Sequence, residues 1–472
     1  MDLTALFLSR LQFAFTVSFH IIFPSFTIGL AAWLTVLEAL HQWTGRVAYR
    51  QVFEFWLKIF GVAFGLGVVS GVVMAFQFGT NWSVLARMSG PIQGPLLSYE
   101  TFTAFFLEAS FFGIMLFGRP RVPPWFYLLS TALVALGTSL SAYWIMANNS
   151  WMQVPVGYAI ENGQFAPDDW FKILFNPVLW VRFPHMLLAS YLTGAFCAAA
   201  TGAWYVLRRE FAAEAHIMLR MGLYLAAVLL PLQLLFGHLN GEYVVHHQPS
   251  KMAAIEARWH DEQPASEVLL AWPNVGSRRN LFAITLPPPL GSLIDSDSLT
   301  AKEVGLDSIP PQNWPPVVVP FFAFRIMVGC WLLMTSIAWV GSYLLHKQRI
   351  ERNRLLLWAT FFSFPLPFIA TLTGWIAAEV GRQPWVVYGV LRTADAMTPF
   401  LTARTAMISL CVYCLVYTFI FAFGTYYIYR LLRAGPGGGL AQPPAAAVPN
   451  RPMSVVDEHH LAPTAPHLTA GE

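Results

Sequence analysis

The sequence predicts an all-α integral membrane protein with about nine transmembrane helices packed in bundles. Hydrophobic residues make up 56% of the 472 residues and charged residues only 11%, whereas about 25% of the residues of a soluble globular protein are charged. Apolar runs of about 20 residues, the length that crosses a bilayer, recur along the chain. Lysine and arginine gather in alternate loops between those runs, a pattern typical of multi-pass membrane proteins.

Short loops separate the apolar runs, with one exception. The nine runs lie near residues 10–38, 53–79, 95–117, 124–147, 178–206, 217–239, 318–346, 355–380 and 402–432. Residues 240–317, between the sixth and the seventh run, form a long polar segment without a spanning run. We therefore divide the chain into helices 1–6 (1–239), an extracytoplasmic loop (240–317), helices 7–9 (318–434) and a disordered cytoplasmic tail rich in Gly, Pro and Ala (435–472).

The positive-inside rule gives the orientation of these helices. The basic residues that follow runs one, three, five, seven and nine are Arg46, Arg50, Arg119, Arg121, Arg208, Arg209, Arg220, Lys347, Arg349, Arg352, Arg354, Arg430 and Arg433. The other short loops are poorer in lysine and arginine, and residues 161–170 carry three acidic side chains. We predict that the N-terminus and the 240–317 loop lie outside and the C-terminus inside.

The remaining composition argues against several classes of protein. The net charge of +3 is too small to indicate nucleic-acid binding. All four cysteines lie inside apolar runs, and Cys411 and Cys414 form a C-x-x-C pair that Leu415 follows in place of His. The pair is therefore no c-type haem attachment site, and neither disulfides nor zinc are indicated.

Ionisable residues inside membrane spans are costly and usually functional. His185 lies about seven residues into run five, and Met327 about nine residues into run seven, or roughly 10 and 14 Å from the outer ends. The two side chains therefore reach a similar depth, and His plus Met is a known axial pair of low-spin haem. Each residue alone also has an ordinary interpretation, a hydrogen-bonded core histidine and a gap-filling methionine.

Four further polar groups lie in the predicted spans. His20 precedes Pro24 by four residues, so the proline removes the hydrogen bond to the His20 carbonyl and bends the helix, which also allows a purely structural histidine. Glu100 lies near the outer end of run three, with Glu108 about two turns deeper and about 80° around the helix. Glu379 follows Trp375 by one turn near the outer end of run eight. Most of these groups thus gather in the outer half of the membrane.

With these residues laid out, the chain resembles subunit I of the cytochrome bd quinol oxidase family over nearly all of residues 5–434. The motifs that carry the resemblance are Gly381-Arg382-Gln383-Pro384-Trp385, Phe322-Ala323-Phe324-Arg325-Ile326-Met327, Ser9-Arg10-Leu11-Gln12-Phe13 and Phe76-Gln77-Phe78-Gly79-Thr80-Asn81-Trp82. The loop is short by family standards, as in the branch that includes cyanide-insensitive oxidases. His238 stands where members often have Asp, which leaves the role of this position open.

The resemblance implies three haems and their ligands. His185 and Met327 are expected to bind the low-spin haem b558. His20 and Glu379 are expected to bind two high-spin haems, haem b595 and haem d (or a haem b in its place), and which residue binds which stays open. Glu100 is expected at the haem d site.

The resemblance also implies supporting roles around the haems and at the loop. Glu108 is expected to transfer protons, and Trp375 to lie beside a haem. Arg325 and Arg382 are expected to balance haem charge.

In the loop, Lys251 and Glu256 match a pair associated with quinol oxidation. A quinol loses two protons with its two electrons, so an acceptor such as Glu256 is useful. Their five-residue spacing fits an exposed helix, on which each could also be an ordinary solvated charge.

The resemblance implies a haem-bearing subunit of a respiratory terminal oxidase in the bacterial cytoplasmic (inner) membrane. Such a chain oxidises ubiquinol or menaquinol at the outer face and reduces O2 to water with protons from the cytoplasm, which builds a membrane potential without pumping. Partners would be subunit II, with room for a very small third subunit, and membrane lipid. Two other functions are a haem b quinol reductase, which needs bis-His haems, and a proton-coupled transporter, which would show an internal repeat and polar groups at the midplane.

Overall fold

The computed structural model describes residues 3–288, 290–291, 299–300 and 302–437, and most of the predicted tail lies outside this range. Within the described residues, nine helical segments are long and apolar enough to cross a membrane, which confirms the predicted fold class. They are α1 (Leu3–Thr44), α2 (Val47–Thr80), α3–η1–α4 (Ser83–Tyr99, Glu100–Phe105 and Phe106–Phe117), α5 (Pro124–Gln153), α6–α7 (Trp170–Leu174 and Leu179–Arg208), α8 (Ala212–His247), α11 (Val318–His346), α12–α13 (Arg354–Phe362 and Leu366–Val380) and α14 (Ala403–Ala434).

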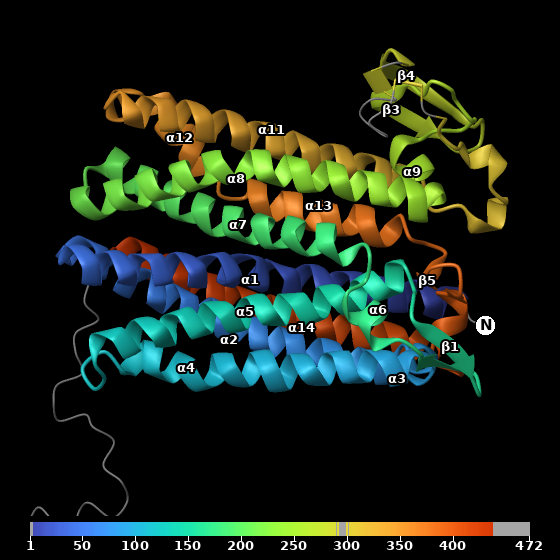
Figure 1. The fold of residues 1–472 in the computed structure, drawn as a ribbon, viewed down its shortest axis with the longest axis horizontal. Helices are drawn as coiled ribbons and strands as arrows, with labels where there is room; N and C mark the ends of the chain where they lie inside the picture. Colours follow the sequence, from blue (N-terminus) through green and yellow to red (C-terminus); the bar gives the residue numbers. More distant parts are fainter. Residues whose placement is uncertain (1–2, 289, 292–298, 301, 438–472) are drawn as a thin grey trace, which may run out of the picture.

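The helices form two groups that lie side by side (Figure 1). One group contains α7, α8, α11 and α12–α13, and the other contains α1, α2, α3–α4, α5 and α14. Helix α7 joins the groups, because it packs against both α1 and α5.

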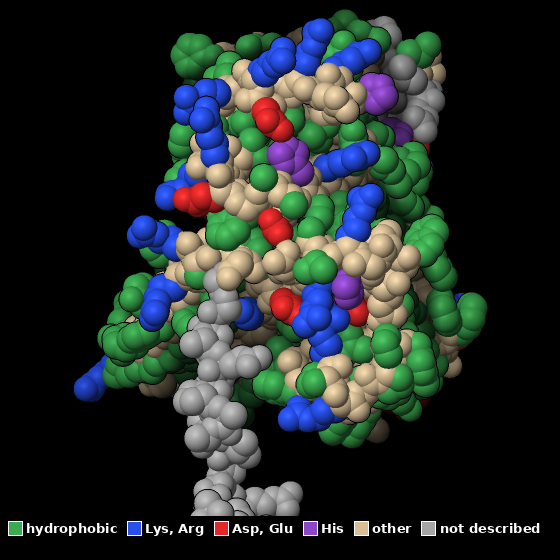
Figure 2. Space-filling model, turned by 90° about the vertical axis from the view of Figure 1, so that its left-hand side faces the viewer, with side chains coloured by type: hydrophobic (Ala, Val, Ile, Leu, Met, Phe, Trp, Pro, Cys, Tyr) green, Lys and Arg blue, Asp and Glu red, His purple; other side chains and the backbone are tan. Residues whose placement is uncertain are grey.

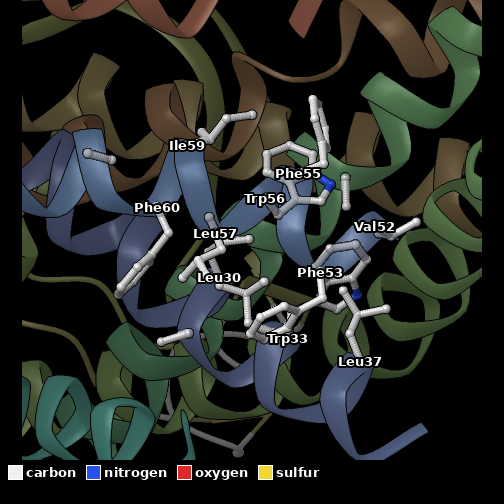
Figure 3. Close-up of a cluster of buried hydrophobic side chains, with 14 of the residues drawn as sticks. Leu30, Trp33, Leu37, Val52, Phe53, Phe55, Trp56, Leu57, Ile59 and Phe60 are labelled. Atoms are coloured by element: carbon white, nitrogen blue, oxygen red, sulfur yellow. The ribbon is translucent and has the colours of Figure 1, made fainter. Parts of the chain in front are cut away.

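Large apolar side chains hold α1 against α2 in the largest buried cluster (Figure 3). Leu30, Leu37 and Phe53 are fully buried there, and Trp33 packs edge-on against Trp56 with ring centroids 6.0 Å apart. Each such side chain contributes about 1.5–3 kcal/mol when removed from water, and in a membrane the same packing acts through close van der Waals contact. This cluster lies toward the end where the basic loops gather.

The two ends of the molecule differ in composition. The turns after α1, α4, α7 and α11 and the end of α14 lie together at one end (Figure 1). Many Lys and Arg side chains lie on the surface of this end (Figure 2). The opposite end carries the N-terminus and three antiparallel hairpins: β1–β2 (Tyr158–Glu161 and Gln164–Pro167), β3–β4 (Glu267–Asn274 and Arg279–Leu286) and β5–β6 (Trp385–Val387 and Leu391–Arg392).

The 240–317 segment is more structured than its polar composition indicated. Its first residues extend α8 to His247, and α9 (Pro249–Glu256) follows directly. The β3–β4 hairpin and the short helices η2 (Leu306–Ser308) and η3 (Pro311–Asn313) complete the described part of the loop. Two further short helices, η4 (Ile350–Arg352) and η5 (Ala394–Ala396), lie in other connections.

The predicted start of span three is wrong. The helix begins at Ser83 instead of near residue 95, and it continues through Pro91 and Pro95. Those prolines, with the small and polar residues around them, lower the hydropathy of this stretch without breaking the helix. Glu100 therefore lies about 26 Å along the helix from Ser83, near its middle and not near its outer end.

Candidate functional site

His20 on α1 is held by a hydrogen-bond chain that fixes its tautomer. Its Nδ1 lies 2.9 Å from Ser70 Oγ on α2, and the Ser70 hydroxyl donates its one proton to the Gly67 carbonyl, 3.0 Å away. Ser70 therefore accepts from His20 Nδ1–H, which leaves the lone pair on Nε2. A Cβ at Gly71 would lie 3.0 Å from His20 Cε1, so a glycine is needed where α2 passes the ring.

His185 and Met327 occupy the other helix group. His185 lies in the second turn of α7, and Gln233 Nε2 of α8 is 3.3 Å from each of its ring nitrogens. Met327 lies in the third turn of α11. Glycines again face both side chains, because a Cβ at Gly237 would lie 3.2 Å from His185 Cε1 and one at Gly374 would lie 3.1 Å from Met327 Sδ.

Glu379 lies near the end of α13 and is held by both of its carboxylate oxygens. Asn149 and Gln153 of α5 donate to Oε1 over 3.0 and 3.1 Å, and Arg382 forms an ion pair with Oε2. Arg382 is 5% exposed, yet its Nε and Nη1 atoms have no hydrogen-bond partner among the described residues. A buried guanidinium with unused donors is suited to an anionic group.

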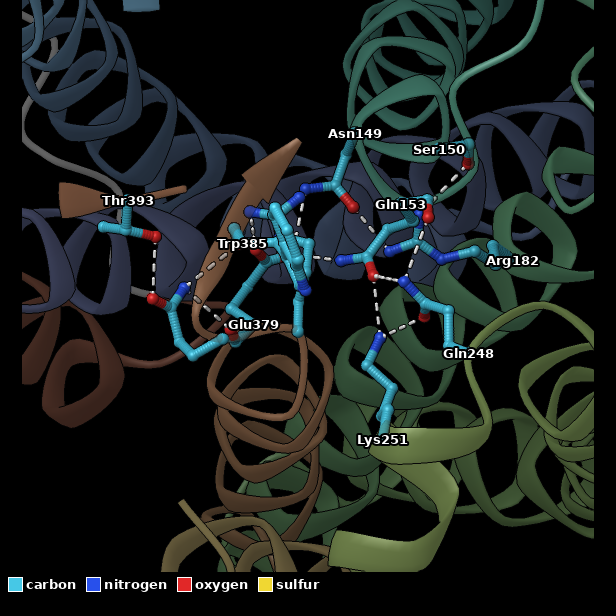
Figure 4. A network of polar contacts seen from close by, with 11 residues as sticks. Asn149, Ser150, Gln153, Arg182, Gln248, Lys251, Glu379, Trp385 and Thr393 are labelled. Carbon is cyan, nitrogen blue, oxygen red and sulfur yellow. Dashed lines mark hydrogen bonds and ion pairs between the residues drawn. The ribbon is translucent and has the colours of Figure 1, made fainter. Parts of the chain in front are cut away.

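The carboxylate of Glu379 belongs to a wider polar network that joins α5, α7, α9 and α13 (Figure 4). Arg182 of α7 donates to Asn149 Oδ1 over 2.5 Å and to Ser150 Oγ over 3.1 Å. Lys251 Nζ of α9 donates to Gln153 Oε1 and Gln248 Oε1, each over 2.7 Å.

Sequence reasoning missed five members of this network: Asn149, Ser150, Gln153, Arg182 and Gln248. Two signals could have found them. Arg182 is an ionisable residue inside run five, three residues before His185. Asn149 and Gln153 are spaced i, i+4 and share one face of a helix end, but the predicted span stopped at residue 147.

Glu100 and Glu108 face the same side of α5. Ser141 Oγ donates to Glu100 Oε1 over 2.6 Å, and the Cγ of Glu108 lies 2.6 Å from where a Gly137 Cβ would be. Ser141 and Gly137 are one turn apart. The two glutamates therefore share a face, as predicted, although η1 is a π-helical segment whose angle per residue differs from that of the α-helix used in the prediction.

Lys251 and Glu256 lie on the predicted helix, but the expectation of an exposed helix is wrong. Their exposed fractions are 3% and 2%, because the rest of the loop and the end of the helix bundle cover α9. Burial lowers the pKa of Lys251 well below its usual range. Burial also raises the pKa of Glu256 well above its usual range, and the neighbouring Glu267 raises it further.

The two loop residues have different neighbours. Lys251 joins the Glu379 network, whereas Glu256 lies 3.3 Å from Arg258 Nη2 in a buried charge cluster. Glu303 lies 3.7 Å from Arg258 Nη1 in the same cluster.

Arg325 ties the loop to the start of α11. Its guanidinium donates to the carbonyls of Leu269, Ile255 and Val268, and lies 3.5 Å from the centroid of the Phe321 ring. Trp375 packs beside a small buried cluster between α5 and α7. Arg325 thus binds loop carbonyls, whereas Arg382 is the predicted charge-balancing residue that retains unused donors.

These residues fit a haem-binding protein. A haem iron takes one or two axial ligands from the protein, and His20 offers a free Nε2 with its other ring nitrogen already oriented. Glycines at positions 71, 237 and 374 keep side chains away from His20, His185 and Met327. The unused donors of Arg382 fit a haem propionate.

Comparisons with known proteins identify the family of this chain. A sequence model of cytochrome bd terminal oxidase subunit I matches residues 8–436. Cytochrome bd-II ubiquinol oxidase subunit 1 of Escherichia coli (strain K12) is 32% identical, covering 93% of this chain and 98% of its own length. Cytochrome bd ubiquinol oxidase subunit 1 of Bacillus subtilis (strain 168) is also 32% identical, covering 92% and 94%.

A solved structure of bd oxidase from Geobacillus thermodenitrificans superimposes with a TM-score of 0.84 at 27% identity, covering 91% of this chain and 98% of the solved chain. Since the family match and the solved fold both extend over nearly all of the helices, the chain belongs to the cytochrome bd terminal oxidase subunit I family.

Proposed function

We propose that this chain oxidises ubiquinol or menaquinol at the side of the molecule that carries α9 and supports the reduction of O2 to water with protons taken from the opposite side. Family membership makes it a multi-pass subunit of a respiratory terminal oxidase that uses a quinol. The membrane is then the bacterial cytoplasmic membrane, with the basic end of Figure 2 toward the cytoplasm. The partner is subunit II, with room for a very small third subunit.

We assign His185 and Met327 as axial ligands of the low-spin haem b558. His20 and Glu379 then bind the high-spin haem b595 and haem d, or a haem b in place of haem d. When bound, these haems supply the electron transfer and the oxygen-binding iron. The observation that carries the assignment is the His20–Ser70–Gly67 hydrogen-bond chain, because it leaves Nε2 of a span histidine ready to bind a metal.

Glu256 is the proton acceptor for the quinol in this proposal. Its burial raises its pKa, and a base whose pKa approaches the working pH accepts a proton efficiently and also releases it. A cavity of about 70 Å³ lies beside it, lined by Arg258, His260 and Glu262 among others. This volume holds about two water molecules and offers a route for the proton away from Glu256.

Proton uptake from the other side uses Glu108 and Glu100. Glu108 is buried, lies two turns closer to the basic end than Glu100, and its Oε1 has no hydrogen-bond partner among the described residues. Glu100 accepts from Ser141 on the helix that both carboxyls face. Glu108 passes protons toward Glu100, and their movement from the basic side into the membrane generates a potential without a pump.

A reduced-minus-oxidised visible spectrum of the purified complex tests the cofactor assignment. Low-spin haem b bands with a red band that responds to carbon monoxide are expected for haem d. Bands of haem b that respond to carbon monoxide, without the red band, would support the variant with three b-type haems. The absence of any haem signal would contradict the proposal.

Reconstituted vesicles test the direction of proton movement. With quinol as donor, turnover is expected to build a membrane potential and to release about one proton outside for each electron, because quinol oxidation frees two protons with two electrons. A chain whose turnover generates no potential, or releases clearly more protons than the quinol supplies, would contradict the proposed arrangement.

A further inference from the structure

The side chain of Gln153 stands between the loop lysine and the carboxylate of Glu379 (Figure 4). Its amide oxygen accepts from Lys251 Nζ over 2.7 Å and from Gln248 Nε2 over 3.0 Å. Its amide nitrogen donates to Glu379 Oε1 over 3.1 Å. Two donors on the oxygen fix the orientation of the amide, so the NH2 group must face the carboxylate.

Lys251 itself is held firmly in this position. Its Nζ also donates to Gln248 Oε1 over 2.7 Å, and the residue is 3% exposed. A Cβ at Gly381 would lie 2.9 Å from Lys251 Cγ, so the lysine stem passes along the end of α13 only because residue 381 is a glycine. An amine has two N–H donors in its neutral form and three in its charged form, so both hydrogen bonds exist in either state.

We propose that Lys251 is a positioning residue that acts on Glu379 through the Gln153 amide, and so couples the loop to the metal-binding carboxylate. The proposal rests on the assignment of Glu379 as a haem ligand. A hydrogen bond to a ligating carboxylate withdraws electron density from it and lowers its donation to the iron. Without the bond, the carboxylate donates more strongly and favours the oxidised iron, so the midpoint potential of that haem falls.

Spectroelectrochemical titration of the purified oxidase tests the coupling through a double-mutant cycle. Lys251→Met and Gln153→Leu are each expected to move the high-spin haem at Glu379 to a more negative potential. The expected change is about tenfold in its redox equilibrium, or about 59 mV for one electron. The double variant is expected to shift no further than the larger single shift, and the low-spin haem to stay unchanged.

The control is Lys302→Met, which removes a charge from an exposed lysine of the same loop that pairs with Asp261 over 3.2 Å. It is expected to leave all potentials unchanged. Shifts that add in the double variant would mean that Lys251 acts as an independent charge, and an unmoved potential in Lys251→Met would mean no coupling; either result overturns the proposal. If the Lys251→Met complex does not assemble, Lys251→Gln is measured instead, because glutamine keeps an N–H donor. A midpoint potential of the Glu379 haem in Lys251→Gln equal to that of the wild type supports the proposal. A shift as large as that of Gln153→Leu overturns it.

A separate variant distinguishes a failure of the coupling from a failure of the ligand assignment. Glu379→Ala is expected to lose or alter one high-spin haem signal while the low-spin bands remain. If all haem signals are unchanged in Glu379→Ala, the ligand assignment is wrong. If Glu379→Ala behaves as expected and Lys251→Met does not, only the coupling is wrong.

Discussion

Replacing His185 by Leu is expected to remove the low-spin haem bands and to lower quinol oxidase turnover by at least about 100-fold. The imidazole is the ligand that α7 supplies, and Gln233 of α8 lies within 3.3 Å of both ring nitrogens. Leucine fills a similar apolar volume but offers no lone pair. The high-spin bands are expected to remain, because His20 and Glu379 lie against other helices.

Met327→Leu gives an independent measurement of the same pair. A Met-to-Leu exchange usually costs less than about 1.5 kcal/mol of stability, so the fold should be kept while the thioether ligand is lost. The low-spin spectrum is then expected to become high-spin. Met186→Leu, the same exchange next to His185 in α7, is the matched control and should leave the spectrum unchanged. Unaltered low-spin bands in Met327→Leu would show that this methionine is not the ligand.

The helices could be predicted from the sequence because their signal is local. Runs such as 318–346 contain enough apolar residues to indicate a span, and α11 has those same bounds. The hydropathy signal gave a wrong boundary at the start of span three. The predicted start was too late, because the stretch around Pro91 and Pro95 is less apolar than the rest of a helix that begins at Ser83. The β1–β2 hairpin was not predicted, although its Asn162-Gly163 pair is a common turn signal and both residues adopt a positive φ.

The partners of the site residues could not be predicted in the same way. His20 and Glu379 stand out because ionisable groups are rare in spans. Ser70 and Asn149 do not stand out, because small hydroxyls and amides occur throughout such helices. Ser70 becomes a partner because α2 packs beside α1, and Asn149 becomes one because the end of α5 reaches Glu379 near the end of α13.

Burial of the loop charges was the largest error of the sequence reading. Lysine and glutamate in an eight-residue helix usually indicate a solvated face, yet Lys251 and Glu256 point in different directions into two polar clusters. Long-range contacts decide this burial, since Arg325 on α11 donates to the carbonyl of Ile255, the residue before Glu256. Membership of the oxidase family also argues against the two alternative functions, a haem b quinol reductase and a proton-coupled transporter.

Glu256→Gln is expected to slow quinol oxidation by about 10²–10⁴-fold, the usual contribution of a general base. The stability of the loop should change little, because glutamine has the size of glutamate and its amide oxygen can still accept from Arg258 Nη2. A base acts only when deprotonated, so the rate of the unaltered chain should fall as the pH decreases through the raised pKa of Glu256. That decrease should therefore occur at a higher pH than an ordinary glutamate would give.

Steady-state rates against pH, with quinol in excess, measure both effects. In Glu256→Gln the acid limb of the profile, which is the decrease in rate at low pH, should disappear together with most of the rate. Glu303→Gln is the matched control, since Glu303 approaches the same guanidinium, Arg258, at 3.7 Å and is also buried. It should retain both the rate and the limb. If Glu256→Gln keeps the acid limb at wild-type rate, another group accepts the quinol proton, and the buried position of Glu256 serves only to hold Arg258 in the loop.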